Sequence, residues 1–353
     1  MRFRLFALQL AALLGSFLFS SCSTELDSNA DYKEIMVIYS VLDPDQTVHY
    51  AKVNKAFVNT GTSALTIAAE HPDSTQYGEE IKVVMQKLRA GKDSVVTNEY
   101  PMERFIATGK EPGIFFSGEQ VMYRTTGSII LADDAIYRIK ATNTRTGVEA
   151  AGATEIVRDV PSNPRTGLCI YTVSRDFGSS GKCFSETQPF NFSPFEKGNM
   201  IIFHQAPNAK IYVAKMKFKF AETTDGVRQE KEVEWYVRNN FIHEGTSDPE
   251  IQLEDGFFQS NLLALIDRSQ DNSTTTREAG DTFVTVTGGS TSLEAYYRIN
   301  NSFSLISQTR PEYDNIQNGT GLVASRRSKI ARGFLTTGAK KTLSTYQELK
   351  FQP

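Results

Sequence analysis

The sequence has few of the residues that carry metal and thiol chemistry. Three cysteines and four histidines in 353 residues leave few ligands for a transition metal and few thiol nucleophiles. Lysine and arginine total 38 against 41 acidic residues, so the basic surplus that phosphate contacts require is missing. No apolar run reaches the roughly 20 residues that span a bilayer as a helix. We therefore expect no nucleic acid partner, no cofactor and no metal site.

The sequence also lacks the local motifs of common enzymes. No G-x-S-x-G elbow, H-E-x-x-H helix, Walker loop or G-x-G-x-x-G follows a strand in the required way. Asp43-Pro44-Asp45 and Asp133-Asp134 do not have the alternating spacing of a calcium loop, which favours turn caps over a cation site. The histidines are too scattered for a ligand set and are interpreted as single satisfied or exposed imidazoles: His49, His71, His204 and His243. The sequence therefore predicts a protein that is not an enzyme.

What is present is an ordinary foldable composition, 40 % hydrophobic and 22 % charged. This composition excludes a disordered or collagen-like chain, and the length allows two domains of roughly 100–200 residues each.

The N-terminus has the features of a signal peptide. Basic residues at positions 2 and 4 precede the apolar stretch Leu5–Phe19, and small residues lead to Cys22. This pattern resembles a bacterial lipobox, in which the cysteine is lipidated on sulfur and becomes the new N-terminus. We predict a signal peptide over 1–21, lipidation of Cys22 and a polar tether over 22–32, which imply a protein anchored to a membrane by lipid without a spanning helix. The alternative is an ordinary cleaved signal peptide in which Cys22 is incidental.

Short alternating segments predict an immunoglobulin-like β-sandwich over residues 33–160. The expected strands are Ile35–Tyr39, Thr47–Val53, Ile81–Leu88, Ser94–Asn98, Phe105–Thr108, Val121–Thr126, Ala135–Thr142 and Val148–Val157, with a short helix at Ser63–Glu70. The D-x-A-x-Y spacing that ends at Tyr137 resembles the tyrosine corner of immunoglobulin and fibronectin type III domains, where the hydroxyl bonds upstream backbone. An unrelated β-meander with an incidental tyrosine is the alternative.

Prolines and a glycine in residues 161–167 predict a linker, followed by a larger antiparallel β-rich domain with a few helices over 168–353. The strand Ile211–Phe220 alternates almost strictly, which places Lys215, Lys217 and Lys219 on the solvent face. Further strands are expected at Leu168–Val173, Met200–His204, Lys231–Val237 and Asp281–Thr287, the last turning at Gly288-Gly289, and helices at Ile251–Ile266 and Ser292–Ser307. The chain is therefore predicted to be mainly β.

The C-terminal part resembles a known family. Leu293–Tyr297, Gln308 and the segment Asn315-Ile316-Gln317-Asn318-Gly319-Thr320-Gly321 are similar to the C-terminal signature of an uncharacterised Bacteroidetes lipoprotein family, domain-of-unknown-function family four-two-four-nine. The segment Tyr39–Pro44 departs from the family pattern. The resemblance implies an outer-membrane lipoprotein that faces the periplasm or the cell surface and is associated with TonB-dependent transporters, and it implies no reaction.

Several smaller features allow two interpretations each. Asn318-Gly319 and Gly321 favour a tight turn with positive φ over a polar ligand loop, with Asn315 bonding nearby backbone. The basic residues Arg326–Lys329 are interpreted as a solvated face, the alternative being a patch for an acidic partner or lipopolysaccharide. The aromatic residues of a Pro-containing segment are interpreted either as an exposed partner surface or as a plug between the domains: Phe184, Phe190, Phe192 and Phe195.

Two covalent modifications are predicted beyond lipidation. With Cys22 lipidated, Cys169 and Cys183 remain in an oxidising compartment, and a hairpin centred near residue 176 would bring them opposite each other as a disulfide. The alternative is two buried thiols on different faces of the sheet. Ser74 and Ser94 resemble O-glycosylation acceptors of Bacteroidetes exported proteins, with simple turn chemistry as the alternative.

These features predict a non-enzymatic, lipid-anchored binding or accessory protein that partners a β-barrel outer-membrane transporter or an assembly component. Two other functions compete with it. One is a carbohydrate- or matrix-binding surface adhesin, and the other is a hydrolase whose catalytic groups converge from distant positions.

Overall fold

The computed structural model describes residues 34–56, 75–89, 91–108, 119–159, 167–173, 182–301 and 313–353. Strands make up 53 % of the structure, which confirms the mainly β class. None of the helices in these ranges has the length and apolarity to cross a bilayer. The following predicted features lie outside the described residues: Cys22, His71, Ser74, the helix at Ser63–Glu70 and residues 161–166 of the linker.

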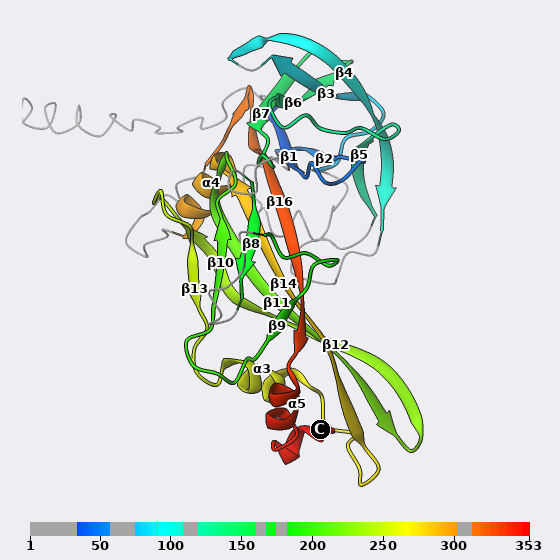
Figure 1. Cartoon of the computed structure of the whole chain (residues 1–353). Coiled ribbons are helices and arrows are strands. Elements are labelled where there is room, and N and C mark those ends of the chain that lie inside the picture. Colours follow the sequence, from blue (N-terminus) through cyan, green and yellow to red (C-terminus); the bar gives the residue numbers. More distant parts are fainter. Residues whose placement is uncertain are drawn as a thin grey trace, which may run out of the picture.

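The first lobe lies at the top of Figure 1 and is built from strands that follow the expected pattern. They are β1 (Met36–Leu42), β2 (Tyr50–Lys55), β3 (Ile81–Arg89), β4 (Lys92–Ala107), β5 (Gln120–Thr125), β6 (Ile136–Asn143) and β7 (Glu149–Glu155). Their hydrogen-bonded order is β1-β2-β5-β4-β3-β6-β7. β4 joins the two halves of this order, because its first part pairs with β3 and its last part with β5.

The single strand β4 replaces the two strands expected at Ser94–Asn98 and Phe105–Thr108. Pro101 lies next to the point where β4 passes from one partner to the other, and its carbonyl oxygen accepts the Thr126 N–H at 3.3 Å. The strand continues past this proline because each side of the junction has its own partner. Ser94, a predicted glycosylation site, lies in this strand.

The predicted tyrosine corner is present. Tyr137 is fully buried on β6, and its hydroxyl accepts the backbone N–H of Ala132 at 2.9 Å. The bond ties the segment before β6 to the strand, as it does at the corresponding corner of immunoglobulin-like domains. The hydrophobic core of the lobe surrounds this ring, with Met36, Ile38 and Ile139 all buried.

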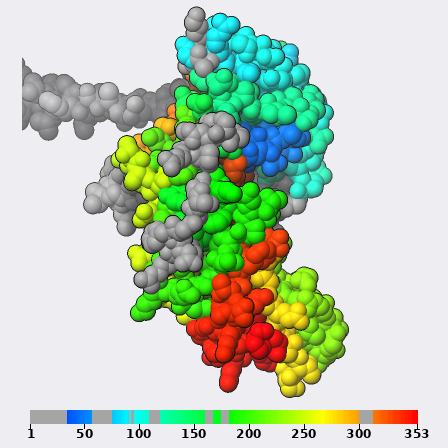
Figure 2. Space-filling model, viewed as in Figure 1, coloured from blue at the N-terminus to red at the C-terminus, as the bar shows by residue number. Residues whose placement is uncertain are grey.

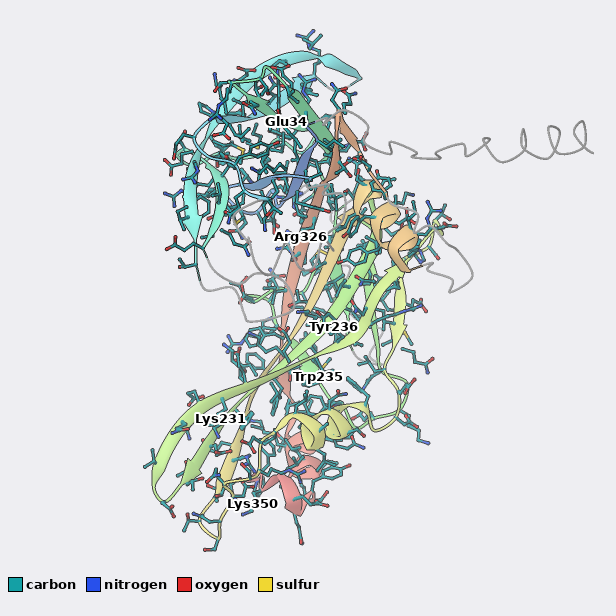
Figure 3. All side chains as sticks on the ribbon, turned by 180° about the vertical axis from the view of Figure 1, so that it is seen from behind. Glu34, Lys231, Trp235, Tyr236, Arg326 and Lys350 are labelled. Atoms are coloured by element: carbon teal, nitrogen blue, oxygen red, sulfur yellow. A yellow bond between two sulfur atoms is a disulfide. The ribbon has the colours of Figure 1, made fainter. Side chains whose placement is uncertain are left out.

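Glu34, at the start of the described chain, is held against the first lobe (Figure 3). Its Oε1 accepts hydrogen bonds from Asn143 at 2.7 Å and from the Tyr77 hydroxyl at 3.0 Å, and its Oε2 accepts one from Thr146 at 2.7 Å. Burial raises the pKa of Glu34, but these hydrogen bonds and the charge of Lys55 more than offset that effect and hold its pKa below 4.5.

The second lobe contains the longest strands. Its strands are β8 (Cys169–Thr172), β9 (Phe190–Phe192), β10 (Met200–His204), β11 (Ala209–Thr224), β12 (Val227–Ile242), β13 (Glu250–Gln252), β14 (Thr276–Ser290) and β16 (Gly319–Leu335), and the short β15 (Ile316–Gln317) precedes β16. Its helices are α3 (Phe257–Leu265), α4 (Thr291–Asn301), α5 (Thr337–Leu343) and the 3₁₀ turn Gln347–Leu349. The antiparallel order β12-β11-β14-β16, called the large sheet below, is part of a continuous 13-stranded mixed sheet, and β13-β10-β8 forms a separate small sheet.

Two expected boundaries in this lobe are wrong, and a third is described only in part. α3 begins at Phe257 and not at Ile251, because residues 250–252 pair with β10 and Gly256 has a φ of 79° that breaks the chain before the helix. β14 does not turn at Gly288-Gly289 but runs to Ser290, since both glycines pair with β11 and β16. α4 ends at Asn301 within the described residues, and the rest of the expected helix lies outside them.

The two lobes share β16, which runs as a spine from one to the other in Figure 1. Its first part pairs in parallel with β1, from Met36 opposite Gly319 to Leu42 opposite Ser325, and its last part pairs with β14. β15, just before it, pairs with β7. The expected boundary, which assigned all of 168–353 to a separate domain, is therefore wrong for residues 316–325, which complete the first lobe.

The turn between β15 and β16 has the predicted character. Asn318 and Gly321 have φ values of 55° and 125°, whereas Gly319 is required by a close approach, because a Cβ there would lie 2.6 Å from the Met36 carbonyl oxygen. The Asn315 side chain donates to the Val323 carbonyl at 2.7 Å and accepts the Val323 N–H at 2.9 Å. This bonding favours the structural interpretation of the motif.

Arg327 corrects the interpretation of the basic stretch as a solvated face. Its side chain is 6 % exposed and donates to Asp133 at 2.9 Å, to Asp45 at 3.2 Å and to the Val157 carbonyl at 3.0 Å. These partners belong to the first lobe, so Arg327 links the lobes from within. The turn at Asp43-Pro44-Asp45 that carries one partner is capped as predicted, by the Asp45 N–H donating to the Asp43 carboxylate at 3.1 Å.

Candidate binding face

The outer face of the large sheet gathers aromatic and charged side chains in cross-strand rows. Strand alternation gives β11 and β14 one buried and one solvent-facing set, as predicted for Lys215, Lys217 and Lys219. One row runs across β12, β11, β14 and β16 as Glu234, Lys217, Phe283 and Arg332, and the next as Tyr236, Lys215, Thr285 and Ile330. Directly opposite residues share a face, so both rows lie on the solvent side.

Neighbouring residues on β12 show how sharply the two faces differ. Trp235 is 7 % exposed and packs edge-on against Phe258 of α3. Tyr236 is 56 % exposed and lies under the Lys215 ammonium at 4.7 Å from the ring centroid. Figure 3 labels both residues on this strand. The inner face therefore forms the core, and the outer face presents aromatic rings to solvent.

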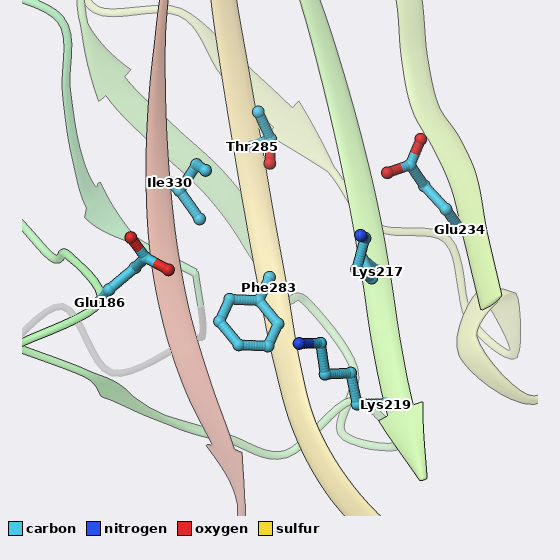
Figure 4. A pocket seen from close by; sticks show the side chains of 7 residues that line it. All are labelled: Glu186, Lys217, Lys219, Glu234, Phe283, Thr285 and Ile330. Atoms are coloured by element: carbon cyan, nitrogen blue, oxygen red, sulfur yellow. The ribbon is translucent and has the colours of Figure 1, made fainter. Parts of the chain in front are cut away.

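A groove of about 290 Å³ lies on this outer face. Its lining comes from five separate segments, as Figure 4 shows: Glu186, Lys217, Lys219, Glu234, Phe283, Thr285 and Ile330. Phe283 lies between Glu186 and Lys219, and the Lys219 ammonium is 5.1 Å from its ring centroid. Glu186 is placed by its neighbour Ser185, whose carbonyl accepts the Arg332 N–H of β16 at 3.2 Å.

Most charges around the groove are paired. Lys215 bonds Glu234 at 2.7 Å and Lys217 bonds Glu232 at 2.8 Å. These hydrogen bonds raise the pKa of both lysines and lower that of Glu232. Within the described part of the chain, Lys219 and Glu186 have no such ion pair, so each keeps its polar atoms for solvent or a ligand.

The predicted aromatic partner surface is wrong. Phe190 and Phe192 are 5 % and 0 % exposed, and Phe184 and Phe195 pack against the same core of the second lobe. The Phe190 ring lies on Gly333, where a Cβ would come within 2.5 Å of it. The segment is buried because β9 pairs with β16, and because these rings stack with residues far along the chain, on α3 and before the C-terminus. They form neither a docking surface nor a plug between the lobes.

The predicted disulfide is present between Cys169 and Cys183, with an S–S distance of 2.06 Å and a Cα–Cα distance of 5.3 Å. The hydrogen bond from the Phe184 N–H to the Ile170 carbonyl, 2.7 Å long, places the two chain segments side by side. Cys183 is three residues before Glu186, so the disulfide anchors the segment that carries the carboxylate of the groove.

The described histidines bond other protein groups. His49 is buried, its ring bonds the Ile129 carbonyl at 3.0 Å, and burial lowers its pKa. His204 bonds Asp248 at 2.8 Å and stacks on Tyr171, whose hydroxyl donates to the same carboxylate. His243 bonds the Ser247 carbonyl at 2.8 Å. Among the described residues, no three His, Cys, Asp or Glu side chains are grouped so that they could hold a metal ion.

A second hollow of about 390 Å³ lies between the lobes, beside the start of α4. Its polar groups serve the junction: Ser290 accepts the Ser325 N–H at 3.1 Å, and Asn208 donates to the Ile156 carbonyl at 3.0 Å. The sheet face is therefore the stronger candidate site.

The residues of the groove were not predicted as a site. Phe283 could have been found from the sequence. In a strand that otherwise alternates Thr with Val, it stands at one of the positions that polar residues occupy. Glu186 could not have been found in this way, since only the paired strands bring it beside β14.

Comparison with protein-family models finds no match to this chain, and comparison with curated proteins finds none either. The resemblance to the Bacteroidetes lipoprotein family stays a prediction.

Proposed function

We propose that the protein is a lipid-anchored binding protein of the outer membrane or cell surface, without catalytic activity, that serves a β-barrel transporter or an assembly component. The observation that carries the proposal is the outer face of the large sheet. Four strands of 15 to 17 residues hold three rings at fixed positions beside cations: Tyr236, Phe283 and Phe334. Exposed aromatic residues on a rigid support are enriched where proteins bind their ligands.

Other features support this proposal. The lipobox at Cys22 and the polar tether after it fit an anchored protein. Figure 2 shows an elongated molecule in which the second lobe, which carries this sheet, extends away from the first lobe.

Photo-crosslinking in the native membrane tests the proposal. A photoreactive amino acid replaces Tyr236 on the sheet face, and the matched control carries it at Ile130, which is 79 % exposed in the first lobe. The proposal expects one β-barrel protein to be captured at 236 and not at 130, and expects the Cys22→Ser variant to lose membrane attachment. Repeated recovery of the protein alone from both positions would refute the partner role.

A second function, a carbohydrate- or matrix-binding adhesin, is favoured by one observation. The exposed part of Phe283 lies between the Glu186 carboxylate and the Lys219 ammonium, neither of which forms an ion pair with another described residue. This is a suitable setting for a ligand rich in hydroxyl groups. This observation also supports a ligand class for the groove.

A further inference from the structure

We propose that the groove around Phe283 binds a neutral saccharide, with one or two sugar rings seated between Glu186 and Lys219. The inference rests on the proposed function, because it names the ligand of the same sheet face.

The polar groups on both sides of the groove can hydrogen-bond to the hydroxyl groups of a ligand. Glu186 contributes carboxylate oxygens that accept hydrogen bonds, and Lys219 contributes an ammonium that only donates. A sugar hydroxyl does both, so neighbouring hydroxyls of one ring can donate to Glu186 and accept from Lys219. The Thr285 hydroxyl, two residues further along β14 than Phe283, adds a group of either kind.

The charge of the lining favours a neutral ligand over a phosphate or sulfate polymer. Two lysines and two glutamates line the groove, and its formal charge is therefore zero. Lys217 and Glu234 are already neutralised by Glu232 and Lys215. A polyanion would meet Glu186 and Glu234 at close range, and like charges brought together oppose binding.

The apolar part of the groove suits the C–H faces of a sugar ring. Phe283 and Ile330 form its apolar lining, and Ile330 is 40 % exposed. Small-molecule sites combine apolar walls with a few placed polar groups, in volumes from about 300 Å³ upward. The volume of about 290 Å³ is just below the lower end of that range, which limits the part of a ligand that the groove holds to a small unit.

The aromatic residues extend beyond the groove in a diagonal line across the sheet. Tyr236 and Phe334 lie on either side of Phe283, one row up on β12 and one row down on β16. From a strand spacing of roughly 4.8 Å and a rise of about 3.4 Å per residue, the Cα atoms of Tyr236 and Phe283 lie about 12 Å apart and those of Phe283 and Phe334 about 8 Å. An extended chain of sugars, with a C–H face on successive rings, fits this line better than an isolated monosaccharide.

The test uses the full-length, detergent-solubilised protein on an array of neutral oligosaccharides of glucose, mannose, galactose, xylose and N-acetylglucosamine. Dextran sulfate and heparin are the anionic comparators. Binding to the strongest neutral oligosaccharide is then measured by calorimetry in low and in high salt. The variants are Phe283→Ala and Glu186→Ala, and the matched control is Tyr50→Ala, which removes a ring that is 46 % exposed on β2 of the first lobe.

We expect a neutral oligosaccharide to bind with little dependence on salt. Phe283→Ala should weaken that binding by about tenfold or more, which corresponds to about 1.4 kcal/mol, Phe283→Tyr should retain it, and Tyr50→Ala should leave it unchanged. Unchanged thermal midpoints would show that the variants fold.

Three results would overturn the inference: no binding of any neutral oligosaccharide, equal affinity in Phe283→Ala, or binding to the sulfated polymers alone. Capture of a β-barrel protein at position 236 together with any of these results would leave the proposed function standing and refute only the saccharide ligand. Saccharide binding without a captured protein would refute the partner role and leave the saccharide ligand standing.

Discussion

Arg277 offers the sharpest test of what stabilises the second lobe. Its side chain is fully buried at the start of β14, where it donates to Asp271 at 2.6 and 3.0 Å and to Glu222 at 2.7 Å. It also donates to the Leu349 carbonyl at 3.0 Å, while its backbone bonds Lys350 and Gln352. Burial lowers the pKa of the Arg277 guanidinium, but the bonds to the two carboxylates more than offset that effect and raise it. One side chain therefore joins β11, β14 and the C-terminal segment.

Replacing Arg277 by methionine keeps much of the side-chain volume and removes the charge. Glu222 and Asp271, whose side chains are 11 % and 12 % exposed, would then be left as nearly buried carboxylates. Glu222 would retain Lys231 as a partner, whereas Asp271 would lose its ion pair. Breaking a buried pair in this way costs roughly 3–5 kcal/mol. For a cooperative unit of about 150–250 residues, that loss lowers the thermal midpoint by roughly 6–20 °C.

Calorimetry and urea unfolding of the full chain measure the effect. The matched control is Arg228→Met, which removes an exposed partner of Glu278 next to Arg277 on β14. Because that pair is open to solvent, its loss should leave the midpoint within error of the parent protein. A midpoint shift below about 2 °C for Arg277→Met would refute the reasoning, as would equal shifts for the two variants.

Three further predictions concern the segment before β15, the disulfide of the second lobe and the titration of Glu34. Asn315→Ala should lower the free energy of unfolding, measured in urea, by about 1–3 kcal/mol, because it leaves the Val323 N–H and carbonyl without their partner. A loss below about 0.5 kcal/mol would contradict the structural role of Asn315. Cys183→Ser should cost about 2–4 kcal/mol by opening the loop closed with Cys169, and a thermal midpoint equal to the parent protein under non-reducing conditions would argue against the bridge. Glu34 has a folded-state pKa below 4.5. The stability that its ionised carboxylate gives to the folded state is therefore complete above pH 4.5 and is lost as the pH falls through the folded-state pKa. The thermal midpoint of Glu34→Gln should therefore decline less between pH 5 and pH 3, measured by circular dichroism, and parallel curves for the two proteins would exclude this contribution.

The strands were predictable wherever alternation alone decides them. β11 keeps an almost strict period of two, so the solvent-facing position of Lys215, Lys217 and Lys219 follows from the sequence. The disulfide and the tyrosine corner were predictable for a similar reason, since each joins residues fewer than 20 positions apart. These features depend on local spacing, which a single sequence contains.

The errors share a physical cause, which is pairing between distant segments. Gly288-Gly289 has the composition of a turn, yet β11 and β16 hold it as strand from both sides. Phe190 and Phe192 occupy a segment with few strand signals, and they are buried because β16 provides a glycine for the first ring and α3 provides Phe258 for the second. No periodicity within either segment contains that information.

The candidate site was missed for the same reason, and β16 explains why one strand can serve both the fold and the site. From residue 327 onward, its odd-numbered side chains point inward, where Arg327 links the lobes and Ala331 and Leu335 are buried. Its even-numbered side chains point outward, where Ile330 and Phe334 are exposed on the candidate face. Because successive side chains of a strand alternate between faces, substitutions at even positions change the candidate face without opening the core. The rigidity of the face and the side chains that it presents to solvent are therefore separable properties of this strand.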